Sequence, residues 1–263
     1  MLHKDAAALA DALKRCENEP IQHIGSIQSH GALLAIDAHS MVKVVSSNLL
    51  EILGLSAKEA LNQPAGRILG EAAWVAIATL PPMAPQSQPV PLLLSLFRGE
   101  ASLDCQAQVH RADNLLVIEI ETPRQTTNLV LPMDSDATDC LLSALLAETD
   151  GIDAYSAVIA QQVQALTGFD RVMVYQFDHQ WNGKVIAECR KHGVASFLGN
   201  HFPASDIPPP ARELYTRNLV RTLVDREAPA VALMQAPGLP AGSSLDLSFS
   251  VLRSMSPIHL AYL

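Results

Sequence analysis

A proline-rich segment, Phe-Pro-Ala-Ser-Asp-Ile-Pro at residues 202–208, constrains this chain more than any other stretch. Its two prolines fix φ, remove two backbone donors and push the residues before them towards extended geometry. Two more prolines follow, and residues 211–221 then have helical spacing, so the segment leads into a helix. We therefore expect Asp206 to lie in a rigid loop whose main-chain carbonyls a helix or ladder does not easily absorb. An ordinary helix start is the simpler interpretation of the same residues.

Length and composition limit the kind of protein that this chain forms. Its 263 residues are enough for two domains, and 49% hydrophobic with 17% charged residues allow a sizeable core. A formal net charge of -9 argues against a nucleic-acid-binding or anionic membrane-binding surface. The N-terminus lacks the apolar core of a signal peptide, and no run of residues is long enough to span a membrane. The sequence predicts a soluble cytoplasmic protein.

The cysteines show no pairing pattern, so neither a zinc site nor a disulfide framework is indicated. They are Cys16, Cys105, Cys140 and Cys189. Cys105 falls in a probable strand and Cys140 in an apolar helix, where a packed thiol is the ordinary interpretation. Cys16 instead lies in a polar stretch, which favours a role for its sulfur chemistry over packing.

The first half of the chain predicts a small antiparallel α+β domain, with the order of elements found in PAS domains. A short helix is expected at 4–15 and an extended connector at 19–28, interrupted by proline and glycine. The expected strands are 30–37, 41–46, 92–97, 101–110 and 115–121, with a helix at 48–53 that ends at Gly54. A proline-rich loop covers 81–91.

The second half begins after a linker at 123–135 and is poorer in strands. Helices are expected at 136–146 and 153–166, the second ended by Gly168. Strands at 171–177 and 184–189 follow, joined by a polar turn that contains Asn182 and Gly183. Residues 224–250 form a long strand-poor section of the kind that is usually functional. Two clear strands do not complete a sheet, so we expect a domain that continues beyond residue 263.

Several polar residues near the C-terminus are candidates for binding. Arg253 lies in an apolar context, where a guanidinium needs an anion such as a carboxylate. Arg217 and Arg221 are four apart and would share a helix face, although an exposed pair with Glu213 also explains Arg217. His259 follows a proline beside an apolar run, where a packed core histidine is the ordinary interpretation.

Five motifs in this order resemble the bacteriophytochromes over nearly the whole chain. They begin at Cys16 (Cys-Glu-Asn-Glu-Pro-Ile), Gly25 (Gly-Ser-Ile-Gln-Ser-His-Gly-Ala-Leu-Leu), Gly168 (Gly-Phe-Asp-Arg-Val-Met-Val-Tyr), Phe202 and Leu252 (Leu-Arg-Ser-Met-Ser-Pro-Ile-His-Leu). The resemblance implies a PAS domain at 30–122 and an incomplete GAF domain at 136–263, after an N-terminal segment at 1–29. It also implies antiparallel sheets flanked by helices, and a red/far-red photoreceptor that holds biliverdin IXα, a linear tetrapyrrole with two propionates.

Matching positions imply a chromophore site. Its residues would be Cys16, Tyr175, Phe202, Asp206, Ile207, Tyr215, Arg221, Arg253, Ser256, His259 and Tyr262. By this resemblance, Cys16 forms a thioether to a vinyl group of ring A. The Asp206 carbonyl accepts hydrogen bonds from the pyrrole N–H groups and shares a water with His259.

The remaining implied roles concern the propionates and ring D. Arg221 and Arg253 would pair with one propionate, Ser256 would assist at the other, and Tyr215 would bond in the same region. Tyr175, Phe202 and Tyr262 would line the pocket around ring D. Such a site is chemically consistent, because a cationic bilin favours carbonyl acceptors, its propionates favour arginine and its faces favour aromatic rings.

Two sequence details bear on attachment and topology. Plant and cyanobacterial phytochromes attach a different bilin at a cysteine just before the GAF histidine; here Ile258 and, at another usable position, Ser205 provide no thiol. Attachment through Cys16 follows, which favours biliverdin. The family also forms a figure-of-eight knot, which would thread Ile27 through residues 224–250. Ile24 departs from the family pattern, which usually has a proline before the glycine.

The resemblance further implies that light isomerises the bilin and that altered contacts around Asp206, His259 and Tyr262 signal to output domains, commonly a histidine kinase. A homodimer and a response-regulator partner would follow, with no catalysis by this region itself. Two other classes remain open. One is a non-photochemical PAS–GAF sensor of a small ligand such as haem or a nucleotide. The other is an enzyme using Cys16 or Asp206 with His259, for which no oxyanion donors or oriented base are evident.

Overall fold

The computed structural model describes residues 19–85, 87–99, 101–121, 150–238 and 244–262. The chain divides into two compact units, each described here by itself. The first unit combines Met1–Gln125 with Pro209–Leu263, and the second is Thr126–Pro208. The helices expected at 4–15 and 136–146, together with Cys16 and Cys140, lie outside the described residues. The domain boundaries inferred from the sequence stay predictions.

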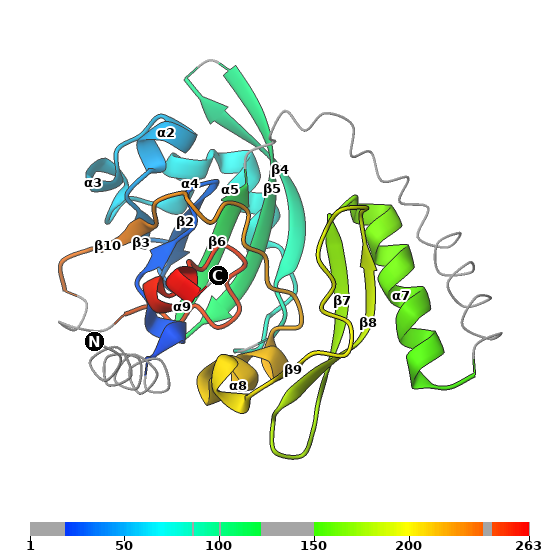
Figure 1. Cartoon of the computed structure of the whole chain (residues 1–263). Coiled ribbons are helices and arrows are strands. Elements are labelled where there is room, and N and C mark those ends of the chain that lie inside the picture. The colour runs from blue at the N-terminus through cyan, green and yellow to red at the C-terminus, as the bar shows by residue number, and fades with distance from the viewer. Residues whose placement is uncertain (1–18, 86, 100, 122–149, 239–243, 263) are drawn as a thin grey trace. The chain divides into compact units, whose positions relative to one another are not determined.

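A seven-stranded antiparallel sheet forms the centre of the first unit (Figure 1). Its strands are β1 (Ser26–Ile27), β2 (Gly31–Ile36), β3 (Val42–Ser46), β4 (Val90–Arg98), β5 (Ala101–Ala112), β6 (Leu115–Glu121) and β10 (Val231–Gln235). Their order across the sheet is β1-β10-β3-β2-β6-β5-β4, and every neighbouring pair is antiparallel. The expected α+β class with antiparallel sheets is confirmed.

The alternation of side chains along β2 explains why this strand lies in the middle of the sheet. Leu34 and Ile36 point into one apolar cluster, while Leu33 and Ala35 point into another on the opposite face. Successive side chains of a strand point to opposite faces, so a strand with no polar position must be covered on both. The whole of β2 is accordingly buried.

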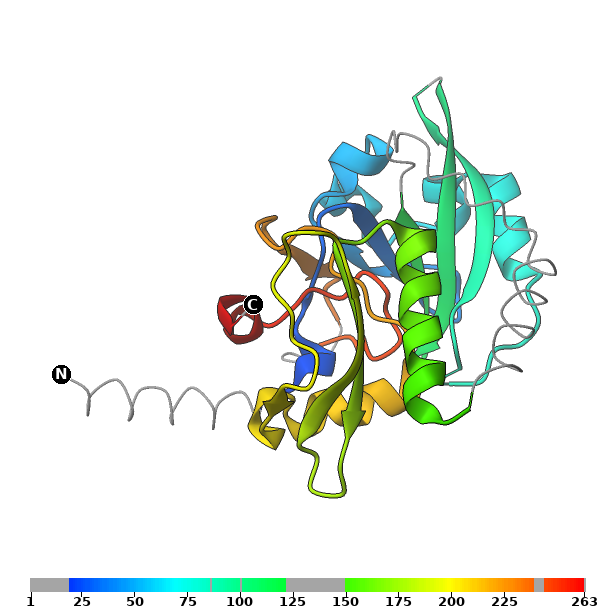
Figure 2. The ribbon, with the colours of Figure 1, turned by 45° about the vertical axis from the view of Figure 1, so that its right-hand side comes forward.

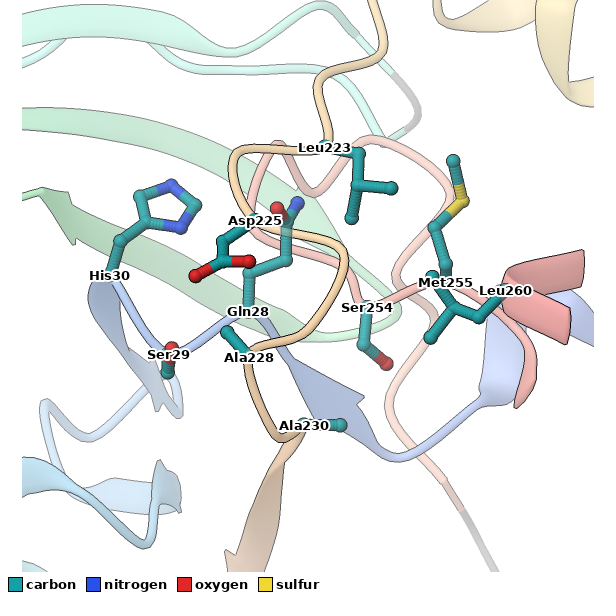
Figure 3. Close-up of a pocket in the computed structure, with 10 residues that line it drawn as sticks. All are labelled: Gln28, Ser29, His30, Leu223, Asp225, Ala228, Ala230, Ser254, Met255 and Leu260. Carbon is teal, nitrogen blue, oxygen red and sulfur yellow. The ribbon is translucent and has the colours of Figure 1, made fainter. Parts of the chain in front are cut away.

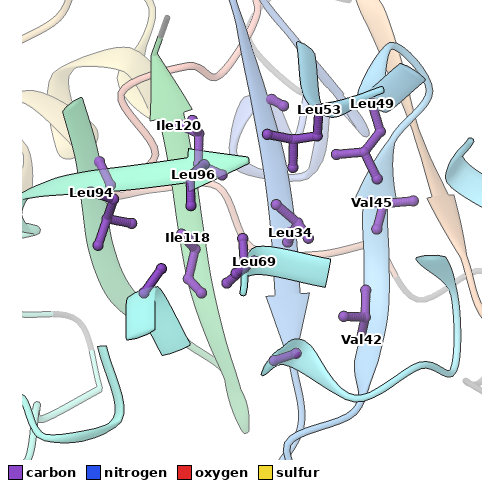
Figure 4. Close-up of a cluster of buried hydrophobic side chains, with 14 of the residues drawn as sticks. Leu34, Val42, Val45, Leu49, Leu53, Leu69, Leu94, Leu96, Ile118 and Ile120 are labelled. Carbon is purple, nitrogen blue, oxygen red and sulfur yellow. The ribbon is translucent and has the colours of Figure 1, made fainter. Parts of the chain in front are cut away.

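Short helices between β3 and β4 cover one face of the sheet and close the larger core (Figure 4). They are α2 (Leu49–Leu53), α3 (Ala57–Ala60), α4 (Ala65–Leu69) and α5 (Glu71–Ala78). The expected glycine stop is confirmed, because Gly54 adopts φ 75° and its N–H caps the Leu50 carbonyl. Helix α3 begins with a capping box between Ser56 and Glu59. Cys105 belongs to this core, as expected of a packed thiol.

Strand β10 is the main difference from the organisation expected from the sequence. It lies inside the section 224–250 that was expected to be strand-poor, and it pairs with β1 on one side and β3 on the other. Strand β4 also begins earlier than expected, at Val90, and includes Pro91. A proline is tolerated there because β4 is at the edge of the sheet, where its missing N–H removes no ladder bond.

The second unit contains helix α7 (Ile152–Thr167) against a three-stranded sheet of β7 (Arg171–Phe177), β8 (Gly183–Arg190) and β9 (His201–Phe202) (Figure 2). Gly168 ends α7 with φ 68°, as expected. A 3-10 turn, η2 (Ala204–Asp206), follows β9. The first unit also contains helices α8 (Pro209–Arg217) and α9 (Pro257–Tyr262). Its N-terminal connector contains the 3-10 turn η1 (Ile21–His23).

Candidate functional site

The proline-rich segment around Asp206 is held as the sequence predicts. Phe202, which precedes the first proline, ends strand β9, and Ile207, which precedes the next, is extended at φ -125° and ψ 94°. Between them, the Asp206 N–H donates to the Pro203 carbonyl at 3.1 Å in a single 3-10 turn. The side-chain amide of Asn182 fastens the segment by accepting from the Ala204 N–H at 3.2 Å.

The carbonyl of Asp206 has no local donor to pair with. A helix or a 3-10 turn would satisfy it with the N–H of the residue three or four positions ahead. Those positions are Pro209 and Pro210, which carry no N–H. Ser205 is in the same situation, because Pro208 and Pro209 stand three and four residues after it. The triple proline thus leaves two consecutive carbonyls available to a ligand donor.

Aromatic rings gather next to this segment within the second unit. Tyr175 lies 5.2 Å from Phe177 and 5.9 Å from Phe202, measured between ring centroids. Phe197 adds a contact at 6.3 Å from Phe202. Burial, with the negative charge of Asp206 as a second cause, raises the pKa of Tyr175. The expected grouping of Tyr175, Phe202 and Asp206 is present here, whereas Phe177 and Phe197 were not identified from the sequence.

Strand β8 makes room for the Tyr175 ring by having glycine at position 183. A Cβ on Gly183 would lie 1.8 Å from the Tyr175 ring, so any other residue would displace that ring. Gly183 was expected only as a turn residue, and this contact gives it a second role.

Arg221 and Arg253 are two neighbouring arginines of the first unit whose guanidiniums are largely buried. The Arg221 Nη2 donates to the carbonyls of Arg253 and Ser254 at 2.5 and 3.0 Å, and the Arg253 Nη1 donates to the Ile21 carbonyl at 3.0 Å. Among the described residues neither guanidinium forms an ion pair with a carboxylate, and the buried Nη1 of Arg221 and Nε of Arg253 have no hydrogen-bond partner. Burial and then the charge of Arg253 lower the pKa of Arg221 to about 10. Two buried guanidiniums without a carboxylate partner are candidates for binding an anion.

The expected helix over residues 211–221 is wrong at its end. Helix α8 stops at Arg217, so Arg221 does not share a helix face with Arg217. Asn218 follows the helix, and its side chain accepts from the Val220 N–H at 3.3 Å and donates to the Ser248 carbonyl at 3.3 Å. Arg217 itself forms the exposed ion pair with Glu213 that the spacing predicts, at 2.5 Å.

The other expected residues of the first unit lie on α8, on α9 or just before α9. Tyr215 is 45% exposed, and its proximity to Arg221 and Arg253 favours their charged forms. Ser256 is buried and donates to the Glu19 carboxylate at 2.5 Å. His259 is half-buried rather than a packed core histidine, and burial followed by the charge of Arg221 lowers its pKa. The Tyr262 side chain lies outside the described residues.

The N-terminal connector is enclosed by the section that follows Arg221. Ile27 pairs with Val231 on one side and bridges to Arg253 on the other, and the Gln28 N–H donates to the Leu252 carbonyl at 2.7 Å. These contacts on both sides are those expected of a threaded connector. The knot itself stays a prediction.

Gln28 is a residue whose role was not identified from the sequence. Its buried amide donates to the Thr222 carbonyl at 2.9 Å and accepts from the Val224 N–H at 3.0 Å. Figure 3 shows segment 223–230 arching over it, around a pocket of about 20 Å³. Such a space holds about one water molecule, so this pocket is a structural feature of the loop and not a site for a large ligand.

In the described parts of the chain, no helix is both long and apolar enough to cross a bilayer.

Residues 16–123 match the PAS fold family. The chain is 37% identical over 262 residues to cyanobacterial phytochrome B of Nostoc sp., covering 95% of the chain and 33% of the relative. It is 33% identical over 251 residues to the bacteriophytochrome of Pseudomonas aeruginosa, with the same two coverages. The chain thus spans about a third of the length of these relatives.

Solved structures agree with these relatives. The wild-type chromophore-binding domain of a Stigmatella aurantiaca phytochrome superposes with a TM-score of 0.81 at 34% identity, covering 94% of this chain and 81% of that one. The chromophore-binding domain of a bacteriophytochrome from R. palustris gives a TM-score of 0.79 at 32% identity, with coverages of 94% and 80%. The chain therefore belongs to the bacteriophytochromes and corresponds to their PAS–GAF region.

Proposed function

We propose that this chain is the chromophore-binding part of a light photoreceptor and that it holds a bilin, specifically biliverdin IXα attached through Cys16. The observation that carries the proposal is the pair of buried arginines, Arg221 and Arg253, which lack a carboxylate partner in the described structure. A bilin carries two propionates, and a planar guanidinium suits a carboxylate. Bound bilin supplies light absorption and isomerisation about a double bond.

Taken by itself, each unit has residues whose chemistry suits a group that such a pigment carries. In the first unit, Arg221 and Arg253 would bind a propionate, with Tyr215 beside them and Ser256 and His259 on the following segment. In the second, the Asp206 carbonyl would accept from pyrrole N–H groups, since the triple proline gives it no local donor. Tyr175 and Phe202 would pack against a flat ring, with Ile207 next to them.

Signalling belongs to the same proposal. We propose that the chain itself is not catalytic and that light changes the contacts of Asp206, His259 and Tyr262. The change would pass to output domains such as a histidine kinase, with a response regulator and a second copy of the protein as partners. A cytoplasmic location stays a prediction from the sequence.

A covalent-attachment assay with a matched cysteine control tests the proposal. The chain is incubated with biliverdin, denatured on a gel and examined for zinc-enhanced bilin fluorescence. We expect a fluorescent band for the wild type and for Cys189→Ala, because Cys189 is a half-buried thiol of strand β8. Cys16→Ala should give no fluorescent band.

Two results would overturn the assignment. The first is the absence of pigment on a chain extended through the whole GAF domain, and the second is full attachment after Cys16→Ala. Binding of haem or a nucleotide in place of biliverdin would favour the alternative, a non-photochemical PAS–GAF sensor.

A further inference from the structure

Glu119 is a buried carboxylate that the chromophore site does not explain. It lies in the middle of β6, between Leu33 of β2 and Gln108 of β5, on the face of the sheet opposite helices α2–α5. Its side chain is 0% exposed. A buried carboxylate is costly unless it is well hydrogen-bonded, so its partners indicate what it does.

All three hydrogen-bond donors to Glu119 come from one short stretch of the chain. Its Oε1 accepts from the Ser250 hydroxyl and from the Leu252 N–H at 2.8 Å, and its Oε2 accepts from the Val251 N–H at 3.0 Å. Glu119 therefore fastens residues 250–252 to the central sheet from a point 131 to 133 residues earlier in the chain.

The fastened stretch leads directly into the arginine pair. After Leu252, the next carbonyls, those of Arg253 and Ser254, are the two that receive the Arg221 guanidinium. Ser254 is held in turn to the connector, because its N–H donates to the Ser26 carbonyl at 3.1 Å. The position of both guanidiniums thus depends on where residues 250–252 are held.

We propose that Glu119 is a positioning residue for the anion site: by binding Ser250, Val251 and Leu252 it holds Arg253 and Arg221 in place for a propionate. This inference rests on the proposed function, because the propionate is that of the bilin. Glu119 itself does not contact the ligand and acts through the backbone of the 250–252 stretch.

Charged groups around Glu119 are consistent with this role. The charge of Arg221 attracts the Glu119 carboxylate and that of Glu121 repels it. The His110 Nδ1 lies 3.8 Å from the Glu119 Oε2. The charge of Asp246 favours the protonated form of His110. Burial raises the pKa of Glu119 to about 7, while the three hydrogen bonds oppose that rise. The ionised form accepts all three bonds, whereas a protonated oxygen is a poorer acceptor.

The test compares graded variants of the whole chain, with biliverdin as the probe. Glu119→Ala removes all three bonds, Glu119→Gln retains one acceptor oxygen, and Ser250→Ala removes one donor. Glu51→Gln, an exposed carboxylate of α2, is the control for the loss of a negative charge. Biliverdin affinity, the absorption band of the bound pigment and hydrogen exchange of the 251 and 252 amides without pigment are measured.

We expect Glu119→Ala to weaken biliverdin binding by about tenfold or more and to speed exchange of both amides by a similar factor. Glu119→Gln and Ser250→Ala should give smaller losses, and Glu51→Gln none. We expect the absorption band of the bound pigment to shift or broaden as the biliverdin affinity falls. In variants that remain folded by circular dichroism, a general fall in stability would not change this band.

The inference is overturned if Glu119→Gln and Ser250→Ala are folded and keep both wild-type affinity and wild-type exchange. If Glu119→Ala does not fold, these two milder variants still test the positioning role of Glu119. If a wild-type chain extended through the whole GAF domain binds no biliverdin, the proposed function and the positioning role are both overturned. The measurement on the wild type alone distinguishes this outcome from the first.

Discussion

The two units bury their apolar side chains in different ways. Among the described residues, the largest fully buried side chains, such as Leu34, Ile118 and Leu252, all belong to the first unit. In the second unit, the buried hydrophobic residues among those that the structure describes are Ala160, Val185 and Ala187. Its larger side chains form half-buried aromatic contacts instead. The described part of the first unit therefore has an extensive apolar core, whereas the described part of the second unit has mainly partly exposed aromatic contacts.

The largest expected effect concerns the core of the first unit. Ile118→Ala should lower the free energy of unfolding by about 2–5 kcal/mol, because a fully buried side chain leaves a cavity. Val185→Ala, in the second unit, should cost about 1–2 kcal/mol, because fewer methyl groups are removed. Urea titrations followed by circular dichroism measure both. A loss for Val185→Ala as large as that for Ile118→Ala would contradict this expected order.

The next effect concerns the aromatic contacts of the second unit. Phe202→Ala should weaken biliverdin binding by about tenfold, because it removes an aromatic face next to Tyr175 and Asp206. Trp181→Ala is the control, because Trp181 is 46% exposed and contacts Phe177 rather than Phe202. Absorbance titration with biliverdin measures the affinities. If both variants bind equally, the rings of this unit do not form the ligand surface.

A third test uses pH and separates the two buried titratable groups of the first unit. Burial raises the pKa of Glu119 from 4.5 to about 7, so its contribution to stability is present below pH 4.5 and is lost as the pH rises to about 7. Burial lowers the pKa of His110 from 6.5 to about 4, so its contribution is present above pH 6.5 and is lost as the pH falls to about 4. Between about pH 4.5 and 6.5, the pH dependence of stability from Glu119 and that from His110 have opposite signs and offset each other.

Glu119→Gln removes the titration of Glu119 and therefore its contribution to the pH dependence of stability, while His110 can still titrate. The free energy of unfolding of the wild type minus that of Glu119→Gln should fall steadily from pH 4.5 to 7. Urea titrations at several pH values give this difference, in which titratable groups distant from Glu119 cancel. A difference that is flat over this range would show that Glu119 is ionised throughout it.

The smallest effect concerns a helix start. Ser56→Ala should destabilise the chain by about 1 kcal/mol, because it removes the side-chain acceptor of the Glu59 N–H in the capping box of α3. Ser47→Ala, at an exposed turn position before α2, is the matched control and should change little. Thermal unfolding measures both. An unchanged midpoint for Ser56→Ala would mean that α3 is held by the core alone.

Local patterns predicted most of the strands and helix ends. Alternation along residues 115–121, and Gly54 and Gly168 at helix ends, depend on near neighbours in the sequence, and the structure agrees with each. Strand β10 could not be found in this way. Its five residues have no hairpin partner nearby, because the strands that flank it, β1 and β3, are some two hundred residues earlier in the chain.

The candidate site was predictable to a similar degree. The apolar context of Arg253 predicted a guanidinium in need of an anion, and the structure shows it buried with an unpartnered Nε. Glu119 was missed because the alternation Val-Ile-Glu-Ile-Glu is typical of a strand with one solvated face. That face is covered by segments distant in the sequence, among them the stretch that contains Val251 and Leu252.

The position of β10 has a consequence for the order in which the chain assembles. Strands β2, β3 and β6 can pair once residue 121 is made, but β3 then has an unpaired edge and β1 has no strand to join. Residues 231–235 fill that gap from more than a hundred residues downstream. Such distant pairing slows folding, and an open edge invites association with other chains. During synthesis the seven-stranded sheet is therefore completed only when residues 231–235 are available, and a product that stops near residue 125 should aggregate.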